Sequence, residues 1–504
     1  MREHLPILIL AVPLAGSGLT LLVGFFSYRL SRWITYGALI LTFLLVWNSF
    51  PKLLSEGPWH YSLGGWAPPW GIELLVTPFS AFLALVLLSL ALITFYYLGH
   101  FGLIAGLLKS RESLGGSLLL VLVSSLLAQL FVRDGFTLYL FLEMSLVAAV
   151  GLHLCVARNI WLDGFYFLLG GSLGPSLLLA GFFFLYASTG TTHLDDILAQ
   201  LFIAKNFSMA ITAGILLTAT WGWHFFFPSP IFFTRLLNQT PPFILGFFSS
   251  ILVRVAAYLF FILLFFVLNV PGMSQPFWLT ALEYLLAVFF FIDFIYAAKQ
   301  KDFLNSVAYL SVAQLGFLFV GFILGNKSAL TGVLMELLSQ TLVVAGLFIA
   351  VGVLSLKPTG AHPISKLAGL GRHDFSAALV LVIFAFSIVG FPPTGGFFGK
   401  FYIVQGILEK HDWVLLIAVG ATIVFNLVTA ARFTWLLFEH RKASSFHASI
   451  PFSAKAPLLV LALTVLLLGV FNQEVVHNFI EPALPKAFTN LPVPNVPFLG
   501  KQVE

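Results

Sequence analysis

Five charged or strongly polar side chains interrupt long apolar stretches of the sequence. Glu143 follows Thr137-Leu-Tyr-Leu-Phe-Leu, Arg254 follows Ile-Leu-Val, Lys400 follows a glycine- and proline-rich run, and Glu336 has Gln340 one helical turn further on. A charge at the centre of a bilayer costs roughly 2.5–3.5 kcal/mol on insertion scales, so it usually has a partner or a function. A carboxylate, a guanidinium and an amine in separate apolar segments predict an axis along which protons or ions move.

These side chains differ in what they can contribute. The protonation state of a buried lysine responds readily to its neighbours, which makes Lys400 the most useful proton carrier. Arg254 stays protonated, so it either biases its neighbours or forms a fixed ion pair. Glu336 either joins the axis or lies near a span end in a structural role. His224, within a proline-rich run, is either a relay group or a satisfied interior histidine.

The composition shows what kind of molecule must position these groups. Among 504 residues, 60% are hydrophobic and only 9% are charged, with 56 phenylalanines. A water-exposed surface for so long a chain cannot be made from so few charges. The single Cys155 excludes a disulfide framework and a cysteine-ligated cluster or zinc site on this chain. Soluble, disordered and fibrous classes are excluded, and the sequence predicts an all-α polytopic membrane protein.

About 20 apolar residues cross a bilayer as a helix, since lipid offers the backbone no hydrogen-bond partner. By this measure we expect about fourteen spans. Their approximate ranges are 5–26, 31–50, 72–100, 114–132, 135–156, 163–187, 208–236, 241–270, 277–298, 303–325, 328–355, 374–407, 412–438 and 455–472. The proline-rich segment after residue 473 predicts a short extended tail.

Lysine and arginine are more frequent in the loops after odd-numbered spans than on the opposite side. The positive-inside rule therefore predicts that both termini lie on the non-cytoplasmic side of the cell (inner) membrane.

Two of the predicted spans contain helix-breaking runs. The seventh contains Trp221-Gly-Trp-His-Phe-Phe-Phe-Pro-Ser-Pro230, and the twelfth contains Gly390-Phe-Pro-Pro-Thr-Gly-Gly-Phe-Phe-Gly-Lys400. Proline removes a backbone donor, so each run should interrupt its helix. The two broken spans occupy matching places, since each is the fourth span of a five-span set, spans 4–8 and spans 9–13. This placement is typical of transporters built from structural repeats. Two ordinary proline kinks would give the same local pattern.

These segments carry an ordered set of motifs over roughly residues 70–440. The motifs are Asp134 with Thr137-Leu-Tyr-Leu-Phe-Leu-Glu143, Tyr166-Phe-Leu-Leu-Gly-Gly-Ser, His224-Phe-Phe-Phe-Pro228, Asp302 with Ala308-Tyr-Leu-Ser-Val-Ala-Gln-Leu-Gly-Phe, Leu338-Ser-Gln340, Leu367-Ala-Gly-Leu-Gly-Arg372 and the run from Gly390 to Lys400. In this order they resemble the antiporter-like membrane subunits of NADH:quinone oxidoreductase (complex I subunits L, M and N) and the D-type subunits of Mrp antiporters.

The resemblance implies fourteen helices and two inverted five-helix repeats around a hydrophilic axis. It divides the chain into an N-terminal three-helix segment (1–110), a first repeat (111–272), a second repeat (273–440) and a C-terminal helix with a proline-rich tail (441–504). In this family a fifth-helix Glu, matched by Glu143, pairs with a seventh-helix Lys. An eighth-helix Lys lies centrally, and a twelfth-helix Lys or Glu, matched by Lys400, is the terminal proton site.

The sequence departs from the family pattern at several positions. Leu217 or Thr218 stands where the seventh-helix Lys is expected, and Gln340 replaces a common eleventh-helix His. Arg254 is the nearest match to the eighth-helix Lys, with the local spacing stretched. These departures leave the fold expectation intact and weaken the expectation of ordinary pumping.

Three functions fit these observations. The first is a proton-translocating subunit of a complex I-like oxidoreductase, with Glu143, Arg254, Lys400, His224, Gln340 and Glu336 as its pathway. The second is an Mrp-type cation/proton antiporter or related uptake subunit, and the third is a non-pumping scaffold paralogue. None places a flavin, nicotinamide, metal or cluster site on this chain. Quinone and NADH are therefore expected only on partner subunits of a multisubunit membrane complex, with lipid around the chain and no nucleic acid bound.

Overall fold

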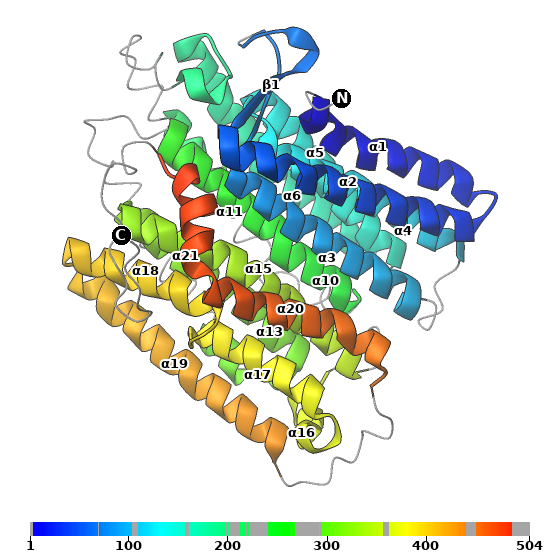
Figure 1. Cartoon of the computed structure of the whole chain (residues 1–504), viewed down its shortest axis with the longest axis vertical. Coiled ribbons are helices and arrows are strands. Elements are labelled where there is room, and N and C mark those ends of the chain that lie inside the picture. Colours follow the sequence, from blue (N-terminus) through cyan, green and yellow to red (C-terminus); the bar gives the residue numbers. More distant parts are fainter. Residues whose placement is uncertain are drawn as a thin grey trace.

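The computed structural model describes residues 4–68, 70–102, 109–156, 161–197, 200, 212–217, 219–220, 240–267, 292, 294–355, 362–439 and 450–485. Long helices lie side by side, with the N-terminal helices at one end of the bundle and α17, α18 and α19 at the other (Figure 1). Within the described ranges, eleven helices are long and apolar enough to cross a membrane. The expected all-α polytopic architecture is confirmed.

The long helices follow the predicted spans closely. They are α1 (Leu5–Gly24), α2 (Tyr28–Glu56), α3 (Pro78–Gly102), α4 (Lys109–Phe131), α5 (Gly135–Val156), α6 (Trp161–Thr189), α15 (Lys327–Ser355), α17 (Phe375–Val389), α18 (Gly395–Lys410), α19 (Trp413–Phe438) and α20 (Phe452–Val470). The predicted seventh and ninth spans lie mostly outside the described residues, and so does the Trp221–Pro230 break.

Three of the predicted spans are interrupted helices. The predicted break in the twelfth span is confirmed, because α17 ends at Val389 and α18 begins at Gly395. The eighth span is divided into α10 (Pro242–Phe247), a π-helical turn η3 (Phe248–Leu252), α11 (Val253–Ile262) and a second π turn η4 (Leu263–Val267). The tenth consists of α13 (Phe303–Ala313) and α14 (Leu315–Leu324), which meet at Gln314.

Side-chain caps fix several helix starts. Asp302, Asp374 and Asp412 precede α13, α17 and α19, and each carboxylate accepts a hydrogen bond from a backbone N–H in the first turn. An aspartate in this position satisfies one of the donors that a helix start leaves without a partner.

Two expectations about the ends of elements were wrong. The third span was predicted from residue 72, but residues 73–76 form strand β2 (Glu73–Val76), which pairs antiparallel with β1 (Trp59–Ser62). The helix begins only at Pro78, because proline suits a first helical position and the Thr77 and Ser80 side chains cap the start.

The segment after residue 473 is also not extended where it is described. It forms α21 (Asn472–Val475), the π turn η6 (Val476–Ile480) and the 3-10 turn η7 (Glu481–Ala483). Its apolar side chains recur at helical spacing, and Phe479 stacks on Phe82 of α3, which holds the segment against the bundle.

Helix α15 lies at the centre of the bundle (Figure 1). It packs against α18, α10, α20, α14 and α17, and 94% of its most apolar window is buried. In α1, α2, α19 and α20, by contrast, only 28–39% of the most apolar window is buried. An acidic side chain on α15 is therefore shielded from lipid on every side.

Candidate functional site

Glu336 on α15 is the centre of the buried polar site. Its side chain is fully buried, and its Oε1 atom lies 2.5 Å from the Nζ atom of Lys400 on α18. Gln340, one turn along α15, donates a hydrogen bond from Nε2 to the same oxygen at 3.0 Å. Lys400 is only 3% exposed, and its Nζ also lies 4.7 Å from the centroid of the Phe317 ring, a cation–π distance. The pair is thus buried inside the helical bundle.

Glycines allow the two helices that carry this pair to approach closely. A Cβ on Gly332 of α15 would lie 2.6 Å from the carbonyl oxygen of Gly399 and 2.7 Å from the backbone nitrogen of Ile403. A Cβ on Gly399 of α18 would lie 2.5 Å from Glu336 Oε2. Small residues at helix crossings in membranes permit such backbone approach. The contact between α15 and α18 therefore depends on these two positions.

The break before α18 also serves the site. Gly390, directly after α17, has a φ of +87°, a conformation that favours glycine. A Cβ there would lie 2.9 Å from the Cδ atom of Lys400. The chain therefore turns at Gly390 and leaves room for the lysine stem.

Arg254 is 1% exposed and joins two elements of the site. Its guanidinium donates to the carbonyl of Ser249, in the π turn η3, and to the carbonyl of Ser311 on α13 at 3.2 Å. Carbonyls in a π turn and in the last turn of a helix are available to such donors. The stretched spacing seen in the sequence coincides with η3, where one extra residue per turn is accommodated.

Gln314 is a buried polar residue that the sequence analysis did not single out. It lies at the junction of α13 and α14, is 1% exposed, and neither its Oε1 nor its Nε2 finds a partner among the described residues. A hydrogen-bond partner among the described residues is also missing for three other buried atoms: Glu336 Oε2, Gln340 Oε1 and Arg254 Nε. Buried polar groups in native proteins are bonded to protein or to ordered water. The sequence signals for Gln314 were an amide in an apolar span and its place in the motif that runs from Ala308 to Phe317.

Glu143 does not belong to this cluster. It is half-buried on α5, which packs against α4 and α6, and no hydrogen bond or ion pair joins it to a described residue. Gln129 of α4 donates to the Phe141 carbonyl and the Ser145 hydroxyl at 3.0 Å, so a polar contact joins the two helices nearby.

Of three further candidate positions, one is described by the structure. Leu217, one of the two candidates for the missing lysine position, is buried, and it lies so close to α6 that a Cβ on Gly181 would meet its side chain at 2.9 Å. Thr218 and His224 lie outside the described residues.

The site consists of two hydrogen-bonded groups. One joins α15 and α18 through Glu336, Gln340 and Lys400, and the other joins α11 to η3 and α13 through Arg254. A carboxylate shared between an ammonium and an amide can exchange a proton with its partner, and the neighbouring guanidinium adds a constant positive charge. Such a cluster in the middle of a multi-pass bundle is typical of ion-translocating membrane proteins.

Comparison with known proteins gives the family. The family described as "NADH:quinone oxidoreductase/Mrp antiporter, TM" matches residues 133–426. The chain belongs to this family, which confirms the resemblance drawn from the sequence motifs.

Individual relatives agree with this assignment. The chain is 32% identical to NADH-quinone oxidoreductase subunit N of Desulforudis audaxviator (strain MP104C), covering 96% of this chain and 99% of that protein. It is 26% identical to the D-type subunit of the Na(+)/H(+) antiporter of Bacillus subtilis (strain 168), covering 78% of each. The fold matches a chain of the Mrp complex from Dietzia sp. DQ12-45-1b with a TM-score of 0.80 at 19% identity, covering 95% of this chain and 96% of that one.

Proposed function

We propose that this chain is a proton-translocating membrane subunit of a complex I-like quinone oxidoreductase. The observation that carries the proposal is the buried pair of Lys400 and Glu336, with Gln340 bonded to the same carboxylate oxygen. The similarity to a subunit N over almost the whole of both chains favours the oxidoreductase assembly. Redox chemistry and quinone binding belong to partner subunits in this proposal.

In this proposal the pair works as a switch with two states. With both groups charged, the lysine holds its proton and the carboxylate stabilises it. With both groups neutral, the proton of Lys400 has moved onto Glu336. The positive charge of Arg254 is then no longer offset by a carboxylate. A charge change on a neighbouring subunit would alter the balance between these states, because electrostatic interactions are strong in a dry interior. Arg254 sets the balance without itself carrying a proton.

Protons reach such a pair through polar groups and water. Gln340 and Gln314 supply amides, and the buried atoms without described partners supply positions for bridging water. Glu143 and His224 are proposed to serve the first repeat in the same way. In this family the fifth-helix Glu has a lysine partner, and at Leu217 the chain offers none, so we propose that the first repeat conducts less readily than the second.

Orientation and location are part of the same proposal. We propose that the chain lies in the cell (inner) membrane with both termini on the non-cytoplasmic side, because the basic loops follow odd-numbered spans.

An Mrp-type cation/proton antiporter is the second candidate, favoured by the similarity to the Bacillus subtilis antiporter. The two candidates differ in their coupling. Proton movement by the oxidoreductase subunit should require an electron donor and a quinone, whereas exchange should follow an imposed sodium or pH gradient without either.

The test is proton uptake by the reconstituted assembly. We expect Lys400→Ala to reduce uptake to background, since the terminal ammonium is lost. We expect Glu143→Gln to reduce it as well. Wild-type rates in both variants, with the assembly intact, would leave only a scaffold role for the chain.

A further inference from the structure

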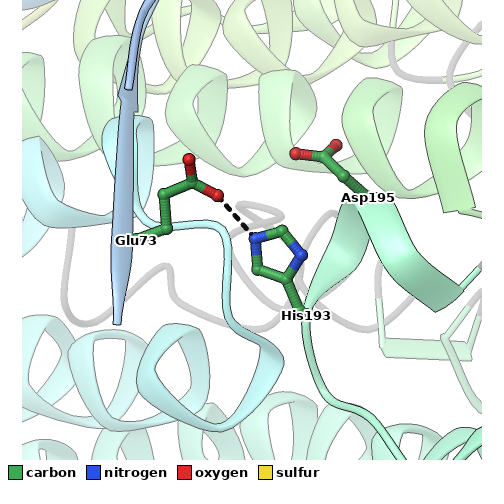
Figure 2. A group of neighbouring side chains, drawn as sticks. All are labelled: Glu73, His193 and Asp195. Carbon is green, nitrogen blue, oxygen red and sulfur yellow. Dashed lines mark hydrogen bonds and ion pairs between the residues drawn. The ribbon is translucent and has the colours of Figure 1, made fainter. Parts of the chain in front are cut away.

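A second group of ionisable side chains lies at one end of the bundle, away from the pair described above. Glu73 of β2 places Oε2 2.7 Å from Nε2 of His193, and His60 of β1 places Nδ1 2.6 Å from Glu73 Oε1. Asp195 lies two residues after His193 in the sequence. The candidate ligand atoms of Glu73, His193 and Asp195 all lie within 4.8 Å of one another. Figure 2 shows the three side chains facing a common point.

Backbone hydrogen bonds fix the segments that carry these side chains. The Arg133 N–H donates to the Glu73 carbonyl at 3.0 Å, and the Leu194 N–H donates to the Arg133 carbonyl at 2.9 Å. The Gly135 N–H donates to the Thr192 carbonyl, also at 2.9 Å. Strand β2, the turn before α5 and the segment after α6 therefore form one unit. A site built from this unit is held in place before any ligand arrives.

The surroundings of His193 resemble those of a metal-binding histidine. Nε2 faces Glu73, while the other ring nitrogen, Nδ1, lies 3.1 Å from the Asp196 carboxylate without the alignment of a hydrogen bond. A histidine that binds a metal with one nitrogen usually orients the other against a carboxylate, carbonyl or water. Glu73 and His193 are 7% and 6% exposed, but Asp195 is exposed, which leaves a route from solvent.

We propose that Glu73, His193 and Asp195 bind a divalent transition-metal ion of the zinc type. One imidazole and two carboxylates are ligands that zinc accepts, with a fourth position left for water or His60. Zinc–ligand distances of about 2.0–2.2 Å in tetrahedral geometry put neighbouring ligand atoms about 3.3–3.6 Å apart. The Glu73–His193 contact needs to open by less than about 1 Å to admit the ion. The bound metal joins the β1–β2 hairpin to the segment after α6.

The proposal is tested by zinc binding to the intact assembly. The purified assembly is stripped with a chelator and titrated with Zn²⁺ alone against a competing chromophoric chelator, and the bound metal is counted by mass spectrometry. We expect the wild type to bind one more zinc ion per chain than His193→Asn or Asp195→Asn. The exposed Asp195 provides a variant that assembles even if His193→Asn does not.

Two further variants make the result specific. Asp196→Asn should weaken zinc binding about 10- to 100-fold without abolishing it, because it removes only the group that orients His193. His477→Asn is the matched control, since His477 is exposed and paired with Glu481 at 3.2 Å without a third ligand nearby among the described residues. It should bind as much zinc as the wild type. Equal zinc content in the wild type, His193→Asn and Asp195→Asn would overturn the proposal.

Discussion

At the scale of single residues, the site rests on the contact between Lys400 of α18 and Glu336 of α15, both buried. Lys400, Arg254 and Glu336 stand out because charges inside apolar segments are rare. Their pairing depends on which helix faces meet, and nothing in one sequence states that α18 crosses α15 at Gly332 and Gly399. Glu336 therefore emerged as the partner of Lys400 only from the structure. Gln314 was not recognised as a buried polar group, because nothing in the motif from Ala308 to Phe317 distinguishes it from the residues beside it.

The Lys400–Glu336 pair can be removed in a way that separates stability from transport. Lys400→Met alone leaves a buried carboxylate without its counter-ion and should destabilise the protein by about 3–5 kcal/mol. The double variant Lys400→Met with Glu336→Leu replaces both charges by apolar groups of similar size and should regain most of that stability. Thermal unfolding in detergent measures both. A double variant no more stable than the single one would show that the pair is not directly coupled.

Arg254 bonds to carbonyls on two elements, so charge and geometry can also be separated there. Arg254→Lys keeps the positive charge but cannot reach both Ser249 and Ser311 in the same way. We expect the assembly to form and its unfolding free energy to fall by about 1.5–3 kcal/mol, the contribution of a hydrogen bond from a charged group. The measurement is unfolding together with size-exclusion of the assembly. Complete loss of assembly would mean that the two-carbonyl contact is indispensable.

At the scale of elements, helix breaks that contain proline can be predicted from the sequence, and other interruptions of a helix cannot. The run from Gly390 to Lys400 predicted the gap between α17 and α18 because proline cannot continue a helix. The π turn η3 contains only ordinary helix residues, Phe-Ser-Ser-Ile-Leu, and gave no such signal. The hairpin strand β2 was taken for the start of a span because its residues Leu74, Leu75 and Val76 continue the apolar run into α3. Composition alone does not separate a short buried strand from a helix.

A larger residue at Gly332 should push α15 and α18 apart where they cross. In Gly332→Ala the new methyl would meet backbone atoms of α18 at 2.6–2.7 Å, so the helices must separate. We expect a loss of about 1–3 kcal/mol in unfolding free energy, as for other overpacked sites, and reduced proton uptake as the pair is pulled apart.

Gly420→Ala is the control for this crossing, because a Cβ on Gly420 in α19 meets nothing within 4 Å. It should be neutral or stabilising by up to about 1 kcal/mol, the helix preference of alanine over glycine. Equal effects of the two substitutions would contradict the account of the crossing.

At the scale of the whole molecule, the outer helices remain strongly apolar. Trp33 and Trp47 on α2 and Trp413 and Trp435 on α19 are all more than half exposed, as suits a surface covered by lipid or by neighbouring subunits. The overall fold was predictable because spans are long and their apolar content is unmistakable. The assembly was not, since the motifs are shared by oxidoreductase and antiporter subunits.

We therefore predict the composition of the assembly from the similarity to subunit N, which is greater than the similarity to the antiporter subunit. An affinity-tagged chain, purified in mild detergent and analysed by mass spectrometry, should bring with it redox subunits of a quinone oxidoreductase. Recovery of small antiporter subunits without any redox subunit would favour the Mrp-type candidate instead.

The central claim is that protons pass through the buried pair of α15 and α18. It is tested by donor- and quinone-driven proton uptake into vesicles containing the assembled Glu336→Leu/Lys400→Met variant, compared with the wild type at equal electron-transfer rate. We expect the variant to assemble and to move fewer protons per electron than the wild type. An unchanged proton-to-electron ratio would contradict the claim.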